Sequence, residues 1–443
     1  MRLDWISSIL EERFGHKFYL TQVETQLCFY LPGFDEEIVF DALCPAFLEA
    51  TSSFSCTIWD AKSEGWDSPL LQPLPAPGLS ELPFPLIEKT PRGFLVHYDI
   101  LGLTYWMLTR QEEVRRTDLD VHGRFPATAS HAFKYGYLER PIVDEWLHVL
   151  GQVICKAWPG LKLRTHDFSM KVSHDVDSPS HYGFRSWPGI VRNMGGYVLK
   201  HGDVSGALRA AWIRLNTRSA LYPKDPANTF SWIMDVSERI GLTSAFYFIC
   251  GRSMPGYDAN YEPEHPAIRS LMRHVHARGH EIGLHPSYGS YRKPDVIKAE
   301  SDRLCRIAEE EGISLPEWGG RMHYLRWEQP TTLRACAAAG MNYDNTLSYA
   351  DRAGFRCGTC FEYPAFDPVA GEALALRVRP LIAMECTVMD QVYMGLGIGE
   401  EARAKFLQLK EACRAVNGCF TLLWHNTQLE SKAKRDLYEA VLH

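Results

Sequence analysis

The stretch Met170-Lys-Val-Ser-His-Asp-Val-Asp177 is an apolar-leaning segment that ends in two carboxylates one residue apart. Successive side chains of a β-strand point to opposite faces, so Asp175 and Asp177 would project from the same face. Two acids on one face at a strand end are poorly explained by folding alone, because ionised carboxylates are rarely buried without a partner. The stretch therefore indicates a functional site, although taken alone it could equally be a strand end with two solvated acids.

Three later segments carry histidines or an arginine at comparable positions. They are Gly279-His-Glu-Ile-Gly-Leu-His285, Arg321-Met-His-Tyr324 and Leu423-Trp-His425. Each is interpreted as the end of another strand. Active sites of (β/α) barrels lie at the carboxyl ends of the strands, so these residues are expected to meet at one site.

In this order, the four segments resemble the motifs of the polysaccharide deacetylase family, the NodB-like carbohydrate esterases. The resemblance covers roughly the second half of the chain. It implies an α/β fold, an irregular (β/α) barrel of seven or eight strands. It also implies that the protein hydrolyses N- or O-acetyl groups on sugars with a divalent metal, usually zinc. Asp175 then matches the catalytic base, Asp177 the metal-binding acid and His285 the first metal histidine.

The same resemblance gives roles to three further residues. Arg321 matches the arginine that orients the base, and His425 matches the general acid. The backbone N–H of Tyr324 would contribute to an oxyanion hole. Amide hydrolysis needs a nucleophilic water, a Lewis acid on the carbonyl and a proton for the leaving amine, and this set of residues with a metal supplies all three.

Two positions depart from the family pattern. The second metal histidine, four residues after the first, is replaced by Gly289, and the proline of the Arg-x-Pro-Tyr motif is replaced by His323. A catalytic zinc normally takes three protein ligands and a water. Arg321 and His323 are two residues apart on one expected strand and would face the same way, which makes His323 a candidate third metal ligand. Alternatively, His323 fills the space of the proline and binds substrate, and the sequence favours neither reading.

Composition bounds the remaining possibilities. The 443 residues carry a net charge of −7 with a pI near 6.2, which gives no overall attraction to nucleic acid. No segment approaches the roughly 20 apolar residues needed to span a bilayer, and the first residues do not form a signal sequence. The 12 cysteines are scattered through apolar segments, which suits a reducing compartment. A cytoplasmic protein is expected, and the sequence carries no signal for a particular oligomeric state.

The length predicts two domains. Residues 1–160 are interpreted as an N-terminal α+β domain without a catalytic motif. Within it, residues 105–120 are expected to form a helix whose charges, at Arg110, Glu112, Glu113, Arg115 and Arg116, make a solvated face.

Residues 168–443 are interpreted as the barrel, because short apolar strands alternate with helical patterns. The expected strands are 169–177, 243–250, 281–285, 318–324, 342–346, 374–378 and 420–425. The expected helices between them include 230–240, 268–278, 296–311, 331–339 and 400–416.

A basic insertion, 178–228, follows the first barrel strand. It contains seven lysines and arginines but only two acids, Asp203 and Asp225. It could hang over the site as a lid that holds an anionic substrate, such as a phosphorylated or uronic sugar. A solubilising helical decoration is an equally good reading.

The sequence thus favours a metal-dependent hydrolase of a carbon–nitrogen bond that is not a peptide bond, most plausibly an N-acetyl group on a small sugar or sugar conjugate. Two alternatives stay open. One is a barrel that has lost activity and serves as a carbohydrate-binding or scaffolding protein, motivated by Gly289 at a ligand position. The other is an amidase that acts on small nitrogenous compounds.

Overall fold

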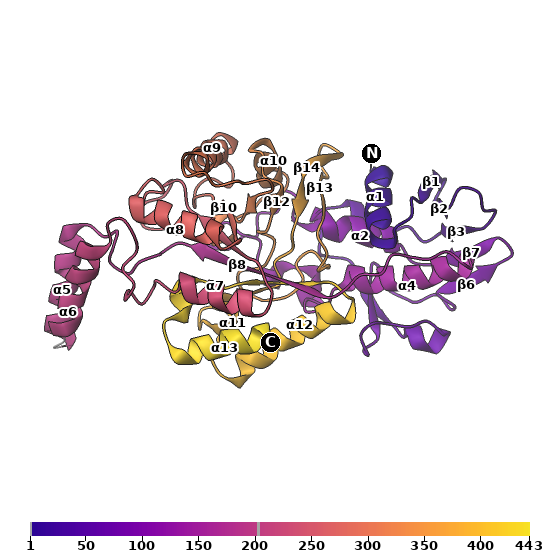
Figure 1. Cartoon of the computed structure of the whole chain (residues 1–443). Helices are drawn as coiled ribbons and strands as arrows, with labels where there is room; N and C mark the ends of the chain where they lie inside the picture. The colour runs from indigo at the N-terminus through magenta and orange to yellow at the C-terminus, as the bar shows by residue number, and fades with distance from the viewer. Residues whose placement is uncertain (1, 202–203) are drawn as a thin grey trace.

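The computed structural model describes residues 2–201 and 204–443, with the side chains of 197–201 left out (Figure 1). The N-terminal part contains helices α1 (Arg2–Phe14), α2 (Ile100–Leu108), α3 (His131–Lys134) and α4 (Ile142–Ala157). Its strands are β1 (Tyr19–Val23), β2 (Gln26–Tyr30), β3 (Glu37–Phe40), β4 (Cys56–Trp59), β5 (Leu74–Pro77), β6 (Ile87–Thr90) and β7 (Gly93–Val96). Five of them form one sheet in the order β1-β2-β3-β7-β6, while β4 pairs with β5.

The second part contains strands β8 (Ser169–Val176), β9 (Ser244–Phe248), β10 (Glu281–Leu284), β11 (Gly319–Gly320), β12 (Tyr343–Asp344), β13 (Tyr363–Asp367), β14 (Glu372–Val378), β15 (Ala383–Met384) and β16 (Cys419–Leu423). Its helices are α5 (Trp187–His201), α6 (Val204–Asn216), α7 (Phe230–Arg239), α8 (Pro266–Ala277), α9 (Pro294–Glu310), α10 (Thr331–Ala338), α11 (Glu385–Met389), α12 (Glu400–Ala415) and α13 (Lys432–Leu442). In Figure 1, α8, α9 and α10 lie on one side of this sheet, and α7, α12 and α13 lie on the other.

The nine strands form one mostly parallel sheet in the order β13-β14-β12-β11-β10-β9-β8-β16-β15. Eight of them are parallel neighbours, and only β13 runs antiparallel, beside β14. The seven strands expected from the sequence did not include β13 and the short β15. Among the described residues, no hydrogen-bonded ladder joins β14 to β15, so the sheet stays open between them.

The sheet is strongly curved. Arg321 follows β11 and its guanidinium lies 2.7 Å from the carboxylate of Asp175 on β8, three strands away. In a flat sheet those strands would be about 14 Å apart, and their side chains would stand parallel without meeting. The curvature therefore brings the carboxyl ends of β8, β10, β11 and β16 around one point.

The strand expected at 318–324 is much shorter. Only Gly319 and Gly320 pair with neighbours, and a Cβ on either would meet a backbone carbonyl oxygen, that of Tyr343 at 2.3 Å or that of Leu284 at 1.9 Å. The chain then leaves the sheet, and Tyr324 and Leu325 adopt left-handed φ values of 62° and 56°. Such values are uncommon outside glycine and concentrate at functional sites.

The helix expected at 105–120 is also wrong. Helix α2 ends at Leu108, and Arg110, Glu112 and Glu113 are buried instead of solvated. Arg110 Nε donates to Glu113 at 2.8 Å, and Glu113 also pairs at 2.5 Å with Arg356 from the second part of the chain. Opposite charges close in sequence can neutralise each other in the interior, so a charged run need not mark a surface.

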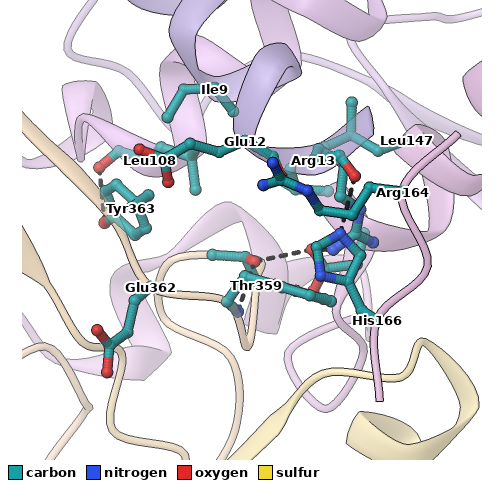
Figure 2. A pocket seen from close by; sticks show the side chains of 13 residues that line it. Ile9, Glu12, Arg13, Leu108, Leu147, Arg164, His166, Thr359, Glu362 and Tyr363 are labelled. Atoms are coloured by element: carbon teal, nitrogen blue, oxygen red, sulfur yellow. Dashed lines mark hydrogen bonds and ion pairs between the residues drawn. The ribbon is translucent and has the colours of Figure 1, made fainter. Parts of the chain in front are cut away.

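A cavity of about 290 Å³ lies where α1 and α4 face the loop 357–363 (Figure 2). Arg13 packs over the ring of Phe361 at 3.8 Å and lies 3.5 Å from the buried carboxylate of Asp144. The cavity is also lined by Leu108, Leu147 and Tyr363. The cavity is distinct from the strand ends described below, and it marks the junction between the two parts of the chain.

The basic insertion forms a helical hairpin of α5 and α6. Figure 1 shows the hairpin standing apart from the body of the molecule, at its left edge. Ser180 and the His181 amide bind the carboxylate of Asp225 at the base of the insertion. In this arrangement the hairpin does not cover the site as a lid would, which favours the alternative reading of a helical decoration. The side chain of Lys200 and all of Asp203, two charges of this insertion, lie outside the described residues.

Among the helices that the structure describes, none combines the length and the apolar composition that a bilayer crossing requires.

Candidate active site

Asp177, His285 and His323 form the centre of the site. Asp177 directly follows β8, His285 directly follows β10, and His323 lies in the turn after β11. Their ligand atoms all lie within 4.8 Å of one another, as a single metal ion would require. The structure therefore brings together Asp177, His285 and the candidate third ligand His323, whose ring lies 4.8 Å from that of His285.

The spacing of these atoms fits a cation. His285 Nε2 lies 3.2 Å from Asp177 Oδ1, and His323 Nε2 lies 3.7 Å from Asp177 Oδ2. Ligands about 2.0–2.1 Å from a tetrahedral zinc are about 3.3 Å apart. Asp177 Oδ1 and His285 Nε2 are buried and form no hydrogen bond, although buried polar atoms rarely lack a partner. A cation bound between these two neighbouring atoms would give both of them a partner.

The other ring nitrogen of each histidine is anchored. His285 Nδ1 donates to the carbonyl oxygen of Arg321 at 2.5 Å, and His323 Nδ1 donates to Asp258 at 3.2 Å. This fixes both rings with Nε2 toward Asp177. A carboxylate behind a histidine is typical of metal sites, because it sets the tautomer and raises the basicity of the ligand. Asp258 was not found from the sequence, since it lies in a loop without a motif.

The charges around Asp177 shape its ionisation. Burial raises the pKa of Asp177, but the neighbouring histidines His323, His285 and His425 outweigh burial and hold it well below its usual range. Burial lowers the pKa of His285, while the carboxylates of Asp175 and Asp177 raise it to a net value above its usual one. Asp177 is therefore ionised at neutral pH, which is the form in which a carboxylate binds a metal.

Asp175 is held in one orientation. Arg321 is fully buried, and its Nη1 donates to Asp175 Oδ1 at 2.7 Å. The same guanidinium donates to Ser173 Oγ at 2.7 Å and to the backbone oxygen of Asn345 at 3.0 Å. With Oδ1 fixed in this way, Asp175 Oδ2 points toward His285 Nε2, 3.6 Å away. The expected pairing of Arg321 with Asp175 is present in the structure.

His425 also lies beside Asp177 and pairs with a carboxylate of its own. Its Nε2 is 3.6 Å from Asp177 Oδ2, and its Nδ1 donates to Glu385 at 2.5 Å. Burial lowers the pKa of His425, but the buried carboxylate of Glu385 outweighs burial and raises it well above the usual value. Glu385, at the start of α11, was missed in the sequence. With Cys386 and His425 it forms a second group of potential ligand atoms.

Tyr324 belongs to an aromatic wall beside the metal cluster, made of His122, Tyr257, Tyr288 and Tyr324. Tyr257 and Tyr288 stack at 4.3 Å, and Tyr324 lies 5.2 Å from Tyr288 and 5.1 Å from His122. Arg124 donates to the carbonyl oxygen of Tyr324 at 2.9 Å, which helps to hold its left-handed backbone. Residues 122–124 thus contribute to the site from the N-terminal part, for which the sequence predicted no functional residue.

Three other residues near the strand ends make contacts that stabilise the fold. The Gly289 amide donates to Ser253 Oγ at 2.6 Å, so this hydroxyl occupies the space where a side chain at position 289 would begin. His174 faces away from the cluster, and its Nδ1 donates to the carbonyl oxygen of Trp424 at 2.6 Å. Asp344 binds the side chain and amide of Thr346, as an Asx-turn does, and burial raises its pKa to about 6.

Residues 5–159 match the model of a family of unknown function, DUF7033. No curated protein matches the chain. Among solved structures, the chain is similar to a "putative polysaccharide deacetylase" from Mycobacterium smegmatis, with 18% identity, a TM-score of 0.39, and coverage of 64% of this chain and 84% of that one. It is also similar to Puue allantoinase, with 13% identity, a TM-score of 0.36, and coverage of 64% and 85%.

Proposed function

We propose that this protein is a metal-dependent hydrolase of a carbon–nitrogen bond other than a peptide bond, and that its substrate carries an N-acetyl group on a sugar or sugar conjugate. One observation supports this proposal above the others. A potential metal triad, an arginine-bound carboxylate and a histidine–carboxylate pair converge around Asp177 at one end of a curved parallel sheet. These are the three functions that amide hydrolysis needs.

The roles of the chain's own residues follow from their contacts. Asp175, fixed by Arg321, accepts the proton of the attacking water through Oδ2, the oxygen that Arg321 leaves free. Asp177, His285 and His323 would hold a divalent cation, with zinc the best fit to two nitrogens and one oxygen. Such a cation polarises a carbonyl and lowers the pKa of bound water.

His425 is placed to give a proton to the leaving amine. Glu385 holds the pKa of His425 well above the usual histidine value, so the ring is protonated at neutral pH and can act as an acid. Its Nε2 is directed toward Asp177 because Nδ1 is bound to Glu385. The Tyr324 amide remains our proposed donor to the oxyanion.

The surroundings of the site support a sugar substrate. The aromatic wall of His122, Tyr257, Tyr288 and Tyr324 offers ring faces of the kind on which sugar rings pack. A small cleft beside Asp177 is lined by Arg185 from the base of the basic insertion, which favours an anionic group on the substrate.

The experiment combines metal analysis with product analysis. The purified protein is assayed for bound zinc and for acetate release from N-acetylated sugars, sugar phosphates and nucleotide-linked sugars. We expect about one zinc per chain at the cluster and acetate as the product. Release of ammonia instead of acetate would identify an amidase, and absence of both metal and turnover would favour a barrel that has lost activity.

Two variants test whether Asp175 and Asp177 have different roles. Asp175→Asn should abolish turnover and keep the metal, whereas Asp177→Asn should lose metal and turnover together. Asp295→Asn, a change of the same size on an exposed helix, serves as the control. Equal metal loss in both site variants would contradict the assignment of Asp175 as base.

A further inference from the structure

Helix α6 of the basic insertion is apolar on two opposite faces. One face is buried within the insertion and includes Ala207, Ala210 and Ile213, each at most 3% exposed. The opposite face carries an apolar stripe, defined here as Val204, Leu208, Trp212 and Leu215, with exposed fractions of 58%, 62%, 57% and 44%. The spacing of four, four and three residues places the stripe along one line of an α-helix. Packing of the hairpin therefore explains the inner face and leaves the stripe unexplained.

The charges around the stripe are positive. Residues 178–228 contain seven lysines and arginines and two acids, in a protein whose net charge is −7. At about 100° per residue, Arg209 and Arg214 flank the stripe on either side of α6. Arg185, Arg214 and Arg218 donate through Nε to backbone carbonyls of the insertion itself, and none of the three forms an ion pair with a residue that the structure describes. Asp225, the acid that the structure describes, is buried at the base.

We propose that the apolar stripe of α6 docks on an anionic lipid surface. A helix that lies in a membrane interface needs an apolar face that includes large residues such as Trp and Leu, arginines beside it and only moderate apolar area. Trp212 supplies the ring that favours the headgroup region, and the arginines attract acidic headgroups. The 13-residue α6 is about 20 Å long and stands clear of the body of the molecule, so a flat surface can reach it (Figure 1).

A protein partner fits the stripe less well. The four exposed side chains offer roughly 400 Å², about half of what one partner of a stable complex buries. Interfacial binding needs less, because an amphipathic helix sinks only about 5–10 Å into the boundary of the bilayer. Positive charge on both sides of the stripe also disfavours a second copy of the hairpin as the occupant.

The hairpin is directly connected to the site, so its docking would also place the site near the lipid surface. The insertion begins at Ser178, one residue after Asp177, and Arg185 at its base lines the cleft beside Asp177. A docked hairpin would hold the rim of the site close to the lipid surface. The docking itself does not depend on the proposed hydrolase activity, so either can fail alone.

The test is flotation of the full-length protein with vesicles of phosphatidylcholine, with and without phosphatidylglycerol. We expect binding to the anionic vesicles at least about tenfold tighter than to the neutral ones, and loss of that difference in high salt. The double variant Val204→Glu with Leu208→Glu should weaken binding by at least about tenfold, and Arg209→Gln alone by about fivefold. Both residues of the double variant are on the outer face of α6, so its melting temperature should match that of the parent.

A matched control places the same two charges on exposed apolar residues elsewhere. Leu71 and Val369 are 106% and 45% exposed, and Leu71→Glu with Val369→Glu should leave vesicle binding unchanged. The proposal is overturned if the parent does not float with anionic vesicles, or if the stripe variant floats as well as the parent. It is also overturned if sedimentation shows a dimer that the stripe variant abolishes while vesicles bind neither protein.

Discussion

Removal of His323 gives the most direct test of the proposed metal centre. In His323→Ala the cluster keeps Asp177 and His285 but loses the nitrogen that lies 3.7 Å from Asp177 Oδ2. Catalytic zinc normally has three protein ligands, so two ligands should hold the metal much more weakly. Asp258→Asn keeps all three ligands and removes only the charge behind His323, to which His323 Nδ1 donates at 3.2 Å.

The two variants should therefore lower the affinity for zinc by different amounts. Loss of a carboxylate behind a ligand typically weakens metal binding 10–100-fold, which is about 1.4–2.8 kcal/mol, so we expect this range for Asp258→Asn. His323→Ala should weaken zinc binding more than that range, by at least about 100-fold. Asp258 also accepts the amides of Tyr288 at 2.6 Å and Met254 at 2.7 Å, so its variant should lose about 1–3 kcal/mol of apoprotein stability as well.

The assay is competition for zinc against a chromophoric chelator, with urea unfolding of the metal-free protein as a separate readout. His274→Ala removes an exposed histidine and serves as the control. If His323→Ala binds zinc within about twofold of the parent, or if Asp258→Asn weakens binding more than His323→Ala does, His323 is not a ligand.

Three further changes test other parts of the structure. His425→Ala should slow hydrolysis of amides far more than that of activated aryl esters, which need little proton donation, and equal losses on both substrates would indicate a structural histidine. Glu113→Gln should cost about 3–5 kcal/mol in urea unfolding, because it leaves buried Arg110 and Arg356 without their carboxylate. Glu400→Gln, at an exposed pair with Arg403, should cost less than about 1 kcal/mol and is its control. Burial raises the pKa of Glu300 to about 7 from 4.5, so the folded parent binds the extra proton and loses up to about 3 kcal/mol of stability between pH 5 and pH 8. Glu300→Gln should not show that loss, and parallel pH profiles of the two proteins would contradict this interpretation.

The parts of the site that lie at strand ends could be predicted from the sequence. Asp175, Asp177, His285 and His425 each lie within two residues of the end of a strand with a clear apolar pattern, and the order of parallel strands brings such ends together. His323 was predicted as a neighbour of Arg321 on one strand. It does point into the cluster, but from a turn with left-handed residues, so the strand argument is wrong in its geometry.

The missed residues share a physical reason. Asp258, Glu385 and His122 act through contacts with residues 65, 40 and more than 150 positions away, and no local periodicity marks such contacts. The buried Glu113 is similar, because its partner Arg356 is 243 residues distant. Local patterns describe which face of an element is apolar, but the pairing of charges in the interior is decided by tertiary packing.

The two departures from the family motifs can be understood as one change. A side chain at position 289 would begin 3.0 Å from Ser253 Oγ, which also accepts the Gly289 amide. That hydroxyl donates to Asp258, and Asp258 in turn binds His323. The loop that crowds a side chain at position 289 therefore also supplies the carboxylate that orients the histidine at position 323. If His323 serves as a metal ligand in place of a residue at position 289, it needs this support, because a histidine without an anchored Nδ1 has neither a fixed tautomer nor a fixed ring. Gly289→His alone should consequently fail to restore zinc affinity to His323→Ala, since Ser253 still occupies the space that the new ring would need.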